Sequence, residues 1–275
     1  MWIPKEEKGG MSISSIFYAI QFSNYLNGKE FDYAIIRGDR YELLFLTAIC
    51  AYRGIPIIHI EAGDQSGVVD NKIRHAISHL SDYHFATNEE SLRRLVNMGL
   101  PMSKIYNFGS LDVEFANEVK PKQIHKKPYI FCAYHGIEGE DEGELNRALE
   151  RFEDYDIIRA KGNGDYNKEY PAEYFEPEDY INLMRGAKVC VGNSSSLIKE
   201  ASILEVGVVL VGDRQKNRLL PNNVLTVPCE EEKIKLAIDF QMGNKHKRDL
   251  IYFQEGTSKN ICNQLKKLSQ ESTQI

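Results

Sequence analysis

The sequence predicts an α/β protein made of two Rossmann-like domains in series, each with a doubly wound parallel sheet. Short apolar runs typical of buried strands alternate with longer helical patterns along the chain. A lysine-rich stretch at residues 118–128, with Pro121 and Pro128, interrupts this alternation near the middle. The length of 275 residues is enough for two domains, and 42% hydrophobic with 27% charged residues is typical of globular proteins.

The first domain is predicted over residues 1–117. It begins with an amphipathic helix over residues 12–28, whose apolar side chains recur close to one side. The predicted strands cover residues 32–36, 55–60, 83–86 and 105–108. The helices predicted between them cover residues 41–53, 71–82 and 91–98, and Gly99 ends the last one.

A linker over residues 118–128 is predicted to lead to the second domain, residues 129–268, with a frayed tail at 269–275. The predicted strands cover residues 129–133, 156–159, 189–191, 206–211 and 225–227. The predicted helices cover residues 178–185, 230–242 and 260–268. Because ligands of such folds bind beyond the carboxyl ends of the strands, two domains facing a cleft would share one site.

Composition narrows the class of partner. The net charge of −6 argues against broad nucleic-acid binding. No apolar run approaches the roughly 18 residues of a membrane span, and the first residues lack a signal-peptide core, so we expect a cytoplasmic protein without a membrane partner. The five cysteines form no Cys-x-x-Cys pair, and His75 and His79 lack a third ligand. We therefore expect free thiols, no metal and no cofactor.

The most informative motif is Gly-Asn-Ser-Ser-Ser at residues 192–196, between a predicted strand and a helical pattern. A strand that ends in small hydroxyl residues and opens a helix leaves unpaired N–H groups at the positive end of the helix dipole. The serine hydroxyls add donors, and Glu200 could accept bonds from a ribose. The motif therefore predicts a nucleotide-diphosphate site, although a serine-rich helix cap explains it equally well.

Acidic residues cluster at one predicted edge of the first sheet. Asp39 and Glu61 each follow a predicted strand, and Asp70 precedes the next helix. A partly buried carboxylate at such a place can act as a general acid or base. Each of them alone also fits a helix cap or a solvated loop, but together they favour catalysis.

The second domain offers a histidine and arginines at strand ends. His135 follows the strand at 129–133, and Arg214 and Arg218 follow the strand at 206–211. A guanidinium there could bind a phosphate or carboxylate, and a solvated turn is the plain alternative.

Taken together, these motifs resemble the UDP-N-acetylglucosamine 2-epimerase family. They occur in order along the chain as Gly38–Glu42, His59–Gly63, Asp70 with Ile73–Ile77, His84–Glu89, Asn107–Ser110, Gly192–Ser196 and Gly212–Gln215. The Asn-Ser-Ser-Ser turn and the Ile-Arg-His-Ala-Ile helix are nearest to the hydrolysing branch. That branch supplies N-acetylmannosamine-type sugars to sialic and legionaminic acid pathways.

The resemblance implies the glycosyltransferase-B arrangement, with UDP held mainly by the C-terminal domain. It also implies abstraction of the sugar C2 proton with anti-elimination of UDP, and then hydration at C2 from the opposite face. The implied catalytic residues are Asp39, Glu61, Asp70 and His135, the last near the leaving phosphate. The implied substrate-binding residues are Arg40, Arg74, His75, Gly192, Asn193, Ser194, Ser195, Ser196, Glu200 and Arg214. Of these, the three serines would face the diphosphate and Glu200 the ribose.

The chain also departs from the family pattern. Family members have further strand–helix units before the Gly-Asp-Arg motif, which here starts at residue 38, and Asn217 stands where Gly is common. We therefore expect a homodimer, or a hetero-oligomer with a chain that supplies the missing strands. Two other functions stay open: a glycosyltransferase of the same fold, and a non-catalytic subunit that binds nucleotide sugars.

Overall fold

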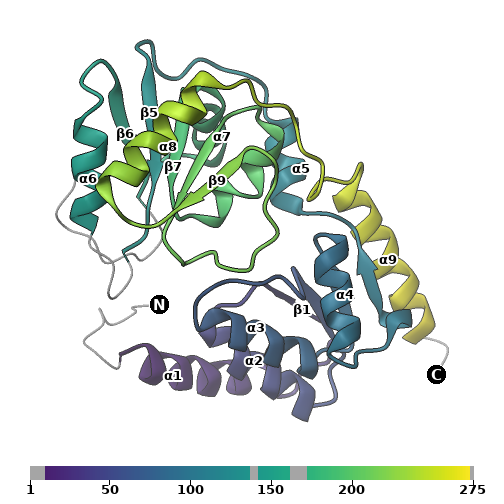
Figure 1. The fold of residues 1–275 in the computed structure, drawn as a ribbon. Helices are drawn as coiled ribbons and strands as arrows, with labels where there is room; N and C mark the ends of the chain where they lie inside the picture. The colour runs from purple at the N-terminus through teal and green to yellow at the C-terminus, as the bar shows by residue number, and fades with distance from the viewer. Residues whose placement is uncertain (1–9, 137–141, 162–171, 273–275) are drawn as a thin grey trace. The chain divides into compact units, whose positions relative to one another are not determined.

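The computed structural model describes residues 10–136, 142–161 and 172–272, and these form two compact units (Figure 1). The first unit contains the described residues up to Gly109 and from Gly256 onward. The second unit runs from Ser110 to Glu255. Each unit has one parallel sheet with helices packed against it, which confirms the predicted α/β class and its two Rossmann-like units.

The sheet of the first unit has four parallel strands in the order β1-β2-β3-β4. The strands are β1 (Ala34–Arg37), β2 (Ile57–Ile60), β3 (Tyr83–Ala86) and β4 (Ile105–Asn107). The helices are α1 (Gly10–Tyr25), α2 (Tyr41–Tyr52), α3 (Asp70–Leu80), α4 (Glu89–Asn97) and the 3₁₀ turn η1 (Met102–Lys104). One apolar cluster joins β1 and β2 to α2 and α3, and another joins β3 and β4 to α4.

The second unit has a five-stranded parallel sheet in the order β6-β5-β7-β8-β9. The strands are β5 (Tyr129–Ala133), β6 (Asp156–Arg159), β7 (Val189–Gly192), β8 (Val208–Val211) and β9 (Val224–Val227). The helices are α5 (Leu111–Glu118), α6 (Glu142–Glu150), α7 (Pro177–Gly186) and α8 (Glu231–Gly243).

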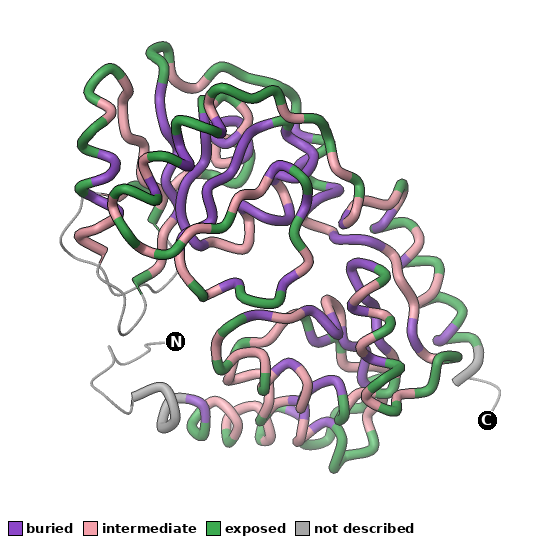
Figure 2. Tube along the Cα trace, viewed as in Figure 1, coloured by how far each residue is buried: buried purple, intermediate pink, exposed green. Residues whose placement is uncertain are grey.

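Burial explains why these strands form the centre of the second unit. All residues of β5, β7 and β8 are buried, and Figure 2 shows buried backbone concentrated there. Alternate residues face opposite sides, as a strand requires. One side packs on α5 and α7 and the other on α6 and α8, so the strands are apolar throughout.

The last helix, α9 (Thr257–Ser272), belongs to the first unit, whereas the sequence analysis assigned residues up to 268 to the second domain. Thr257 Oγ1 donates to Phe108 O at 2.7 Å, and Tyr33 Oη donates to Leu268 O at 2.7 Å. These contacts are far apart in sequence, so local patterns do not reveal them. The helix also includes residues 269–272, which were predicted as tail, and α5 groups with the second unit.

Most predicted strands and helices occur within a few residues of their predicted places, but three differences matter. The helices α5 and α6 were not predicted. The helical pattern after the serine-rich turn is wrong as an α-helix, because two short 3₁₀ turns, η2 (Ser195–Leu197) and η3 (Glu200–Ile203), stand there. Leu197, Ile198 and Ala201 are all fully buried, so packing on several sides replaces a one-sided helix.

No helix among the described residues combines the length and the apolar character needed to span a lipid bilayer. All five cysteines are free, as expected; Cys50, Cys132 and Cys190 are buried, Cys229 is half-buried and Cys262 is exposed.

Candidate active site

Two acidic residues of the first unit lie just after the carboxyl ends of neighbouring strands. In the register of β1 and β2, Arg37 lies opposite Ile60, and Gly38 N donates to Ile60 O at 3.1 Å. Asp39 and Glu61 therefore follow strands that end at the same edge. This is the edge at which ligands bind in parallel sheets.

Glu61 combines an unusual backbone conformation with an ion pair of its side chain. Its φ is 64°, which a side chain other than Gly rarely adopts. Arg37 donates to Glu61 Oε1 from Nε at 3.0 Å and from Nη2 at 2.8 Å, and the Glu61 side chain is only 12% exposed. Such strain costs about 1–3 kcal/mol and is found where a side chain must be aimed. The Glu61 carboxylate is thus a fixed, ion-paired group.

Asp39 is paired with a buried guanidinium. Arg74 Nη2 of α3 makes a short contact with Asp39 Oδ2, and the Arg74 side chain is 4% exposed. Among the described residues no acceptor is in reach of Arg74 Nε or Nη1. A buried guanidinium with two unsatisfied donors is costly, so the site is suited to an added acceptor from a ligand. Asp70 is the first residue of the same helix, one turn before Arg74.

His59 positions the turn that carries Asp39. Its Nε2 is 2.9 Å from Gly38 O and its Nδ1 is 3.0 Å from Ser78 Oγ. A carbonyl only accepts, so Nε2 carries the proton and Nδ1 accepts from Ser78. Burial lowers the pKa of His59 to about 3, so the ring stays neutral. Sequence analysis noted His59 only as part of a motif; a histidine inside an otherwise apolar strand was the available signal.

His75, also on α3, is half-buried and lies beside charged groups. Burial lowers its pKa, and the nearby Arg74 and Arg94 lower it further. Its Nδ1 has no hydrogen-bond partner among the described residues. Arg40, in contrast, pairs with Glu42 at 2.7 Å near the surface, with 64% of its side chain exposed.

A second carboxylate in the loop after Glu61 fixes that loop, and sequence analysis did not identify it. Asp64 is buried, and its Oδ1 accepts from Thr87 Oγ1 at 2.6 Å and from Ser91 Oγ at 2.7 Å. Asn88 caps α4 by accepting from Ser91 N at 2.8 Å. This network fixes the loop that follows Glu61 to the start of α4.

In the second unit, Gly192 allows β7 to turn closely against β5. Its φ is 139°, and a Cβ there would lie 2.1 Å from Ala133 O. The N–H groups of Asn193 and Ser194 both donate to that carbonyl, at 3.1 and 3.2 Å. The expectation that the turn leaves these N–H groups unpaired is therefore wrong for Asn193 and Ser194.

Asn193 holds the backbone of His135. Its Oδ1 accepts from His135 N at 2.8 Å, and its Nδ2 donates to His135 O at 2.8 Å. The Asn193 carbonyl in turn accepts from Arg214 Nη1 at 3.1 Å and Gln215 Nε2 at 2.9 Å. The structure thus brings together four residues of the second unit. Asn193 positions the His135 backbone, and its predicted contact with substrate stays a prediction.

The three serines lie half-buried at the start of η2. Ser194 Oγ is 2.9 Å from Ser196 Oγ, which is 2.6 Å from Tyr180 Oη of α7. Within the described ranges, the N–H groups of Ser195 and Ser196 find no acceptor, as expected at the first turn of a helix. Tyr180 was not singled out from the sequence, because it lies on a different helix.

Two further positions noted in the sequence are Glu200 and Asn217. Glu200 is the first residue of η3, one short turn after the serines. Asn217 has φ 65°, a left-handed conformation that Asn tolerates better than most residues, so it can replace a glycine there. Nowhere in the described ranges do three acidic, His or Cys side chains gather in a way suited to a metal ion.

Comparison with known proteins connects this geometry to one family. Residues 5–266 match the family described as UDP-N-acetylglucosamine 2-epimerase. The GDP/UDP-N,N'-diacetylbacillosamine 2-epimerase (hydrolyzing) of Campylobacter jejuni is 30% identical over 252 residues, covering 78% of this chain and 64% of the relative. The UDP-N-acetylglucosamine 2-epimerase of Neisseria meningitidis is 31% identical over 265 residues, covering 86% and 69%. The chain thus spans about two thirds of the length of these relatives.

The fold is also similar to that of solved structures. The crystal structure of UDP-GlcNAc 2-epimerase from Neisseria meningitidis bound to UDP-GlcNAc matches with a TM-score of 0.76 at 18% identity. The match covers 97% of this chain and 84% of that one. A structure of UDP-GlcNAc 2-epimerase from Methanocaldococcus jannaschii matches with a TM-score of 0.75 at 19% identity, covering 96% and 83%.

Proposed function

This chain belongs to the UDP-N-acetylglucosamine 2-epimerase family, and we propose that it is a UDP-acetamidosugar 2-epimerase of the hydrolysing kind. The observation that carries the proposal is the pair of carboxylates at neighbouring strand ends, Asp39 and Glu61, each held by a guanidinium. The names of relatives from Campylobacter jejuni and Legionella pneumophila, both marked as hydrolyzing, support the branch.

The chemistry needs groups that move a proton at a weakly acidic carbon. The C2–H bond of the sugar breaks as a carboxylate takes the proton, the C1–O bond breaks, and UDP leaves with the electron pair. Water then adds across the C1–C2 double bond: C2 regains a proton on the opposite face, and C1 receives the hydroxyl. We assign these proton transfers to Asp39, Glu61 and Asp70, because ionised carboxylates can act as the base.

We assign the nucleotide to the second unit. The N–H groups of Ser195 and Ser196 and the serine hydroxyls provide donors of the kind that bind phosphate oxygens. Arg214 adds a cation beside the same turn, where it already contacts Asn193 O. His135, fixed by Asn193, would stabilise the departing diphosphate, and Glu200 would accept from the ribose. The association with a second chain remains a prediction.

The test is the release of UDP from UDP-N-acetylglucosamine by the full chain, with the sugar product identified by NMR. We expect UDP and free N-acetylmannosamine. Glu61→Gln should lower the rate by about 100-fold or more, because amides do not accept the proton.

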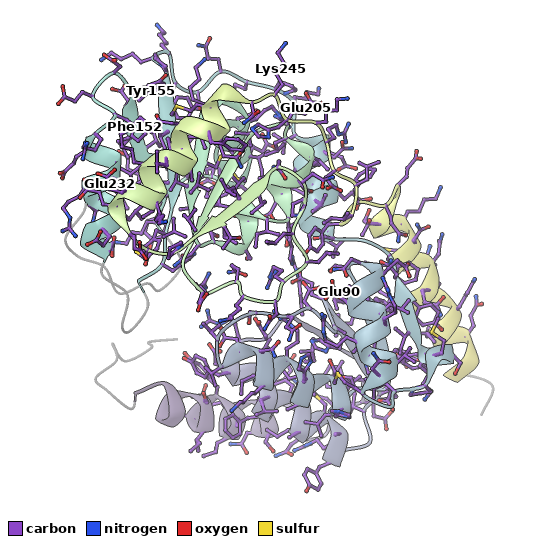
Figure 3. The ribbon with its side chains drawn as sticks, viewed as in Figure 1. Glu90, Phe152, Tyr155, Glu205, Glu232 and Lys245 are labelled. Carbon is purple, nitrogen blue, oxygen red and sulfur yellow. The ribbon has the colours of Figure 1, made fainter. Side chains whose placement is uncertain are left out.

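Glu205→Gln is the matched control, because Glu205 is also a glutamate with positive φ, at 58°, and is exposed (Figure 3). Its rate should equal that of the unchanged protein. The proposal would be contradicted if the protein formed neither UDP nor free sugar, both from this substrate and from a UDP-diacetamido sugar. UDP binding without turnover would instead favour the non-catalytic binding role.

A further inference from the structure

Tyr180 begins a row of three hydroxyls that leads into the serine-rich turn. Tyr180 Oη is 2.6 Å from Ser196 Oγ, and Ser196 Oγ is 2.9 Å from Ser194 Oγ. The Tyr180 ring is fixed edge-to-face against Phe131 of β5, with ring centroids 5.1 Å apart and an interplanar angle of 86°. The row therefore starts at a half-buried ring packed against the core of the second unit and ends at half-buried serines.

Either oxygen of each pair in this row could donate, and only one of the two directions suits an anion. Burial raises the pKa of Tyr180, so its hydroxyl stays protonated and has a hydrogen to donate. Ser196 Oγ, 2.6 Å away, can accept this hydrogen. Once Ser196 accepts from Tyr180, its own hydrogen is directed to Ser194 Oγ, and the hydrogen of Ser194 remains for a ligand.

We propose that Tyr180 is a positioning residue for the diphosphate, which it serves by orienting Ser196 and Ser194 as donors toward a phosphate oxygen. This inference rests on the proposed function of the same turn. A row that pointed the other way would present lone pairs to an anion and would weaken its binding. With the N–H groups of Ser195 and Ser196, the oriented hydroxyls add donors to the same turn.

The measurement is the dissociation constant of UDP and of uridine, by calorimetry on the full chain. Tyr180→Phe keeps the ring that contacts Phe131 and removes only the hydroxyl. We expect UDP to bind about 10-fold more weakly and uridine to bind as before, because hydrogen bonds to charged groups contribute more than neutral ones. A merely structural tyrosine would affect both ligands alike.

Tyr155→Phe is the matched control. Tyr155 is in the same unit, where its ring lies 6.4 Å from that of Phe152, and both are labelled in Figure 3. Its variant should bind UDP and uridine as the unchanged protein does.

Ser196→Ala interrupts the same row at its middle hydroxyl. It should also weaken the binding of UDP and leave the binding of uridine unchanged. Because Tyr180 acts through Ser196, the double variant should bind UDP no more weakly than Ser196→Ala. Independent, additive losses would overturn the inference, as would unchanged UDP affinity in Tyr180→Phe. If Tyr180→Phe does not fold, an unchanged UDP affinity in Ser196→Ala overturns the inference by itself. If the unchanged protein does not bind UDP, the proposed function fails instead.

Discussion

The two sheets end in different chemistry. At the carboxyl edge of the first sheet, charges are paired with charges: Glu61 with Arg37, and Asp39 with the buried Arg74. At the corresponding edge of the second sheet, β7 is followed by neutral residues. The backbone N–H groups of Asn193 and Ser194 donate to Ala133 O, and Ser196 Oγ is 2.6 Å from Tyr180 Oη.

This difference fits the two tasks that we propose for these edges. Taking a proton from carbon needs a base, and a carboxylate can act as one. Binding an anion needs donors without competing negative charge, which backbone N–H groups and hydroxyls supply. The first edge is therefore suited to catalysis and the second to nucleotide binding, and the predictions below test this contrast.

The largest loss of stability is expected at the charged edge. Arg74→Met removes the partner of Asp39 and should destabilise the first unit by about 3 kcal/mol, since the Asp39 carboxylate, only 25% exposed, is left without its partner. Hydrogen exchange of amides in β1 and β2 measures this locally. Arg40→Met, at the exposed pair with Glu42, should cost less than about 1 kcal/mol. Equal costs would contradict a special role for Arg74.

The neutral edge depends on the close approach of β7 to β5. Gly192→Ala should destabilise the second unit by about 3 kcal/mol, because a Cβ would meet Ala133 O at 2.1 Å in a strained backbone. Amide exchange in β7 and β8 should rise, and UDP binding should be lost. Gly243→Ala is the control, because nothing lies within 4 Å of its Cβ. Normal exchange in Gly192→Ala would refute the steric argument.

A smaller effect is expected from the bridge to His135. Asn193→Ala removes two hydrogen bonds to the His135 backbone and should cost about 2 kcal/mol, seen as faster amide exchange after β5. Asn244→Ala, which removes one exposed hydrogen bond to Phe240 O, should have little effect. Similar exchange in both variants would show that the bridge contributes nothing.

At neutral pH, the smallest change in stability is expected for His59→Gln, because the Gln amide can also donate to Gly38 O and accept from Ser78. The pKa of His59 is about 3 in the folded chain, below its ordinary 6.5, so the unfolded chain takes up the proton first as pH falls. This contribution to stability is complete above about pH 6.5 and is lost toward pH 3.

Between pH 7 and pH 5, the free energy of unfolding should therefore fall by about 2 kcal/mol less in His59→Gln than in the unchanged protein. Denaturation of both proteins across this range measures the difference. Parallel curves would show that His59 does not titrate as described.

Sequence alone predicted the strands and placed Asp39 and Glu61 just after two of them. The runs in β5 and β7 are continuously apolar because both faces of that sheet are covered, and such runs are easy to recognise. The α6 helix was missed although Leu145, Ala148 and Leu149 recur with helical spacing.

What sequence could not supply were partners distant along the chain. Tyr180 and Ser196 lie on separate elements, and Asn193 and His135 are 58 residues apart. The 3₁₀ turns after the serines also escaped prediction, because tertiary packing of Leu197 and Ala201 overrides local preference there.

The most direct test of the contrast between the edges measures UDP affinity and UDP release in two variants side by side. Glu61→Gln should keep the UDP dissociation constant and lose turnover by about 100-fold. Ser196→Ala should raise the UDP dissociation constant by about 10-fold. The division of roles between the two edges would be wrong if Glu61→Gln weakened UDP binding as much as Ser196→Ala does, or if it kept its turnover.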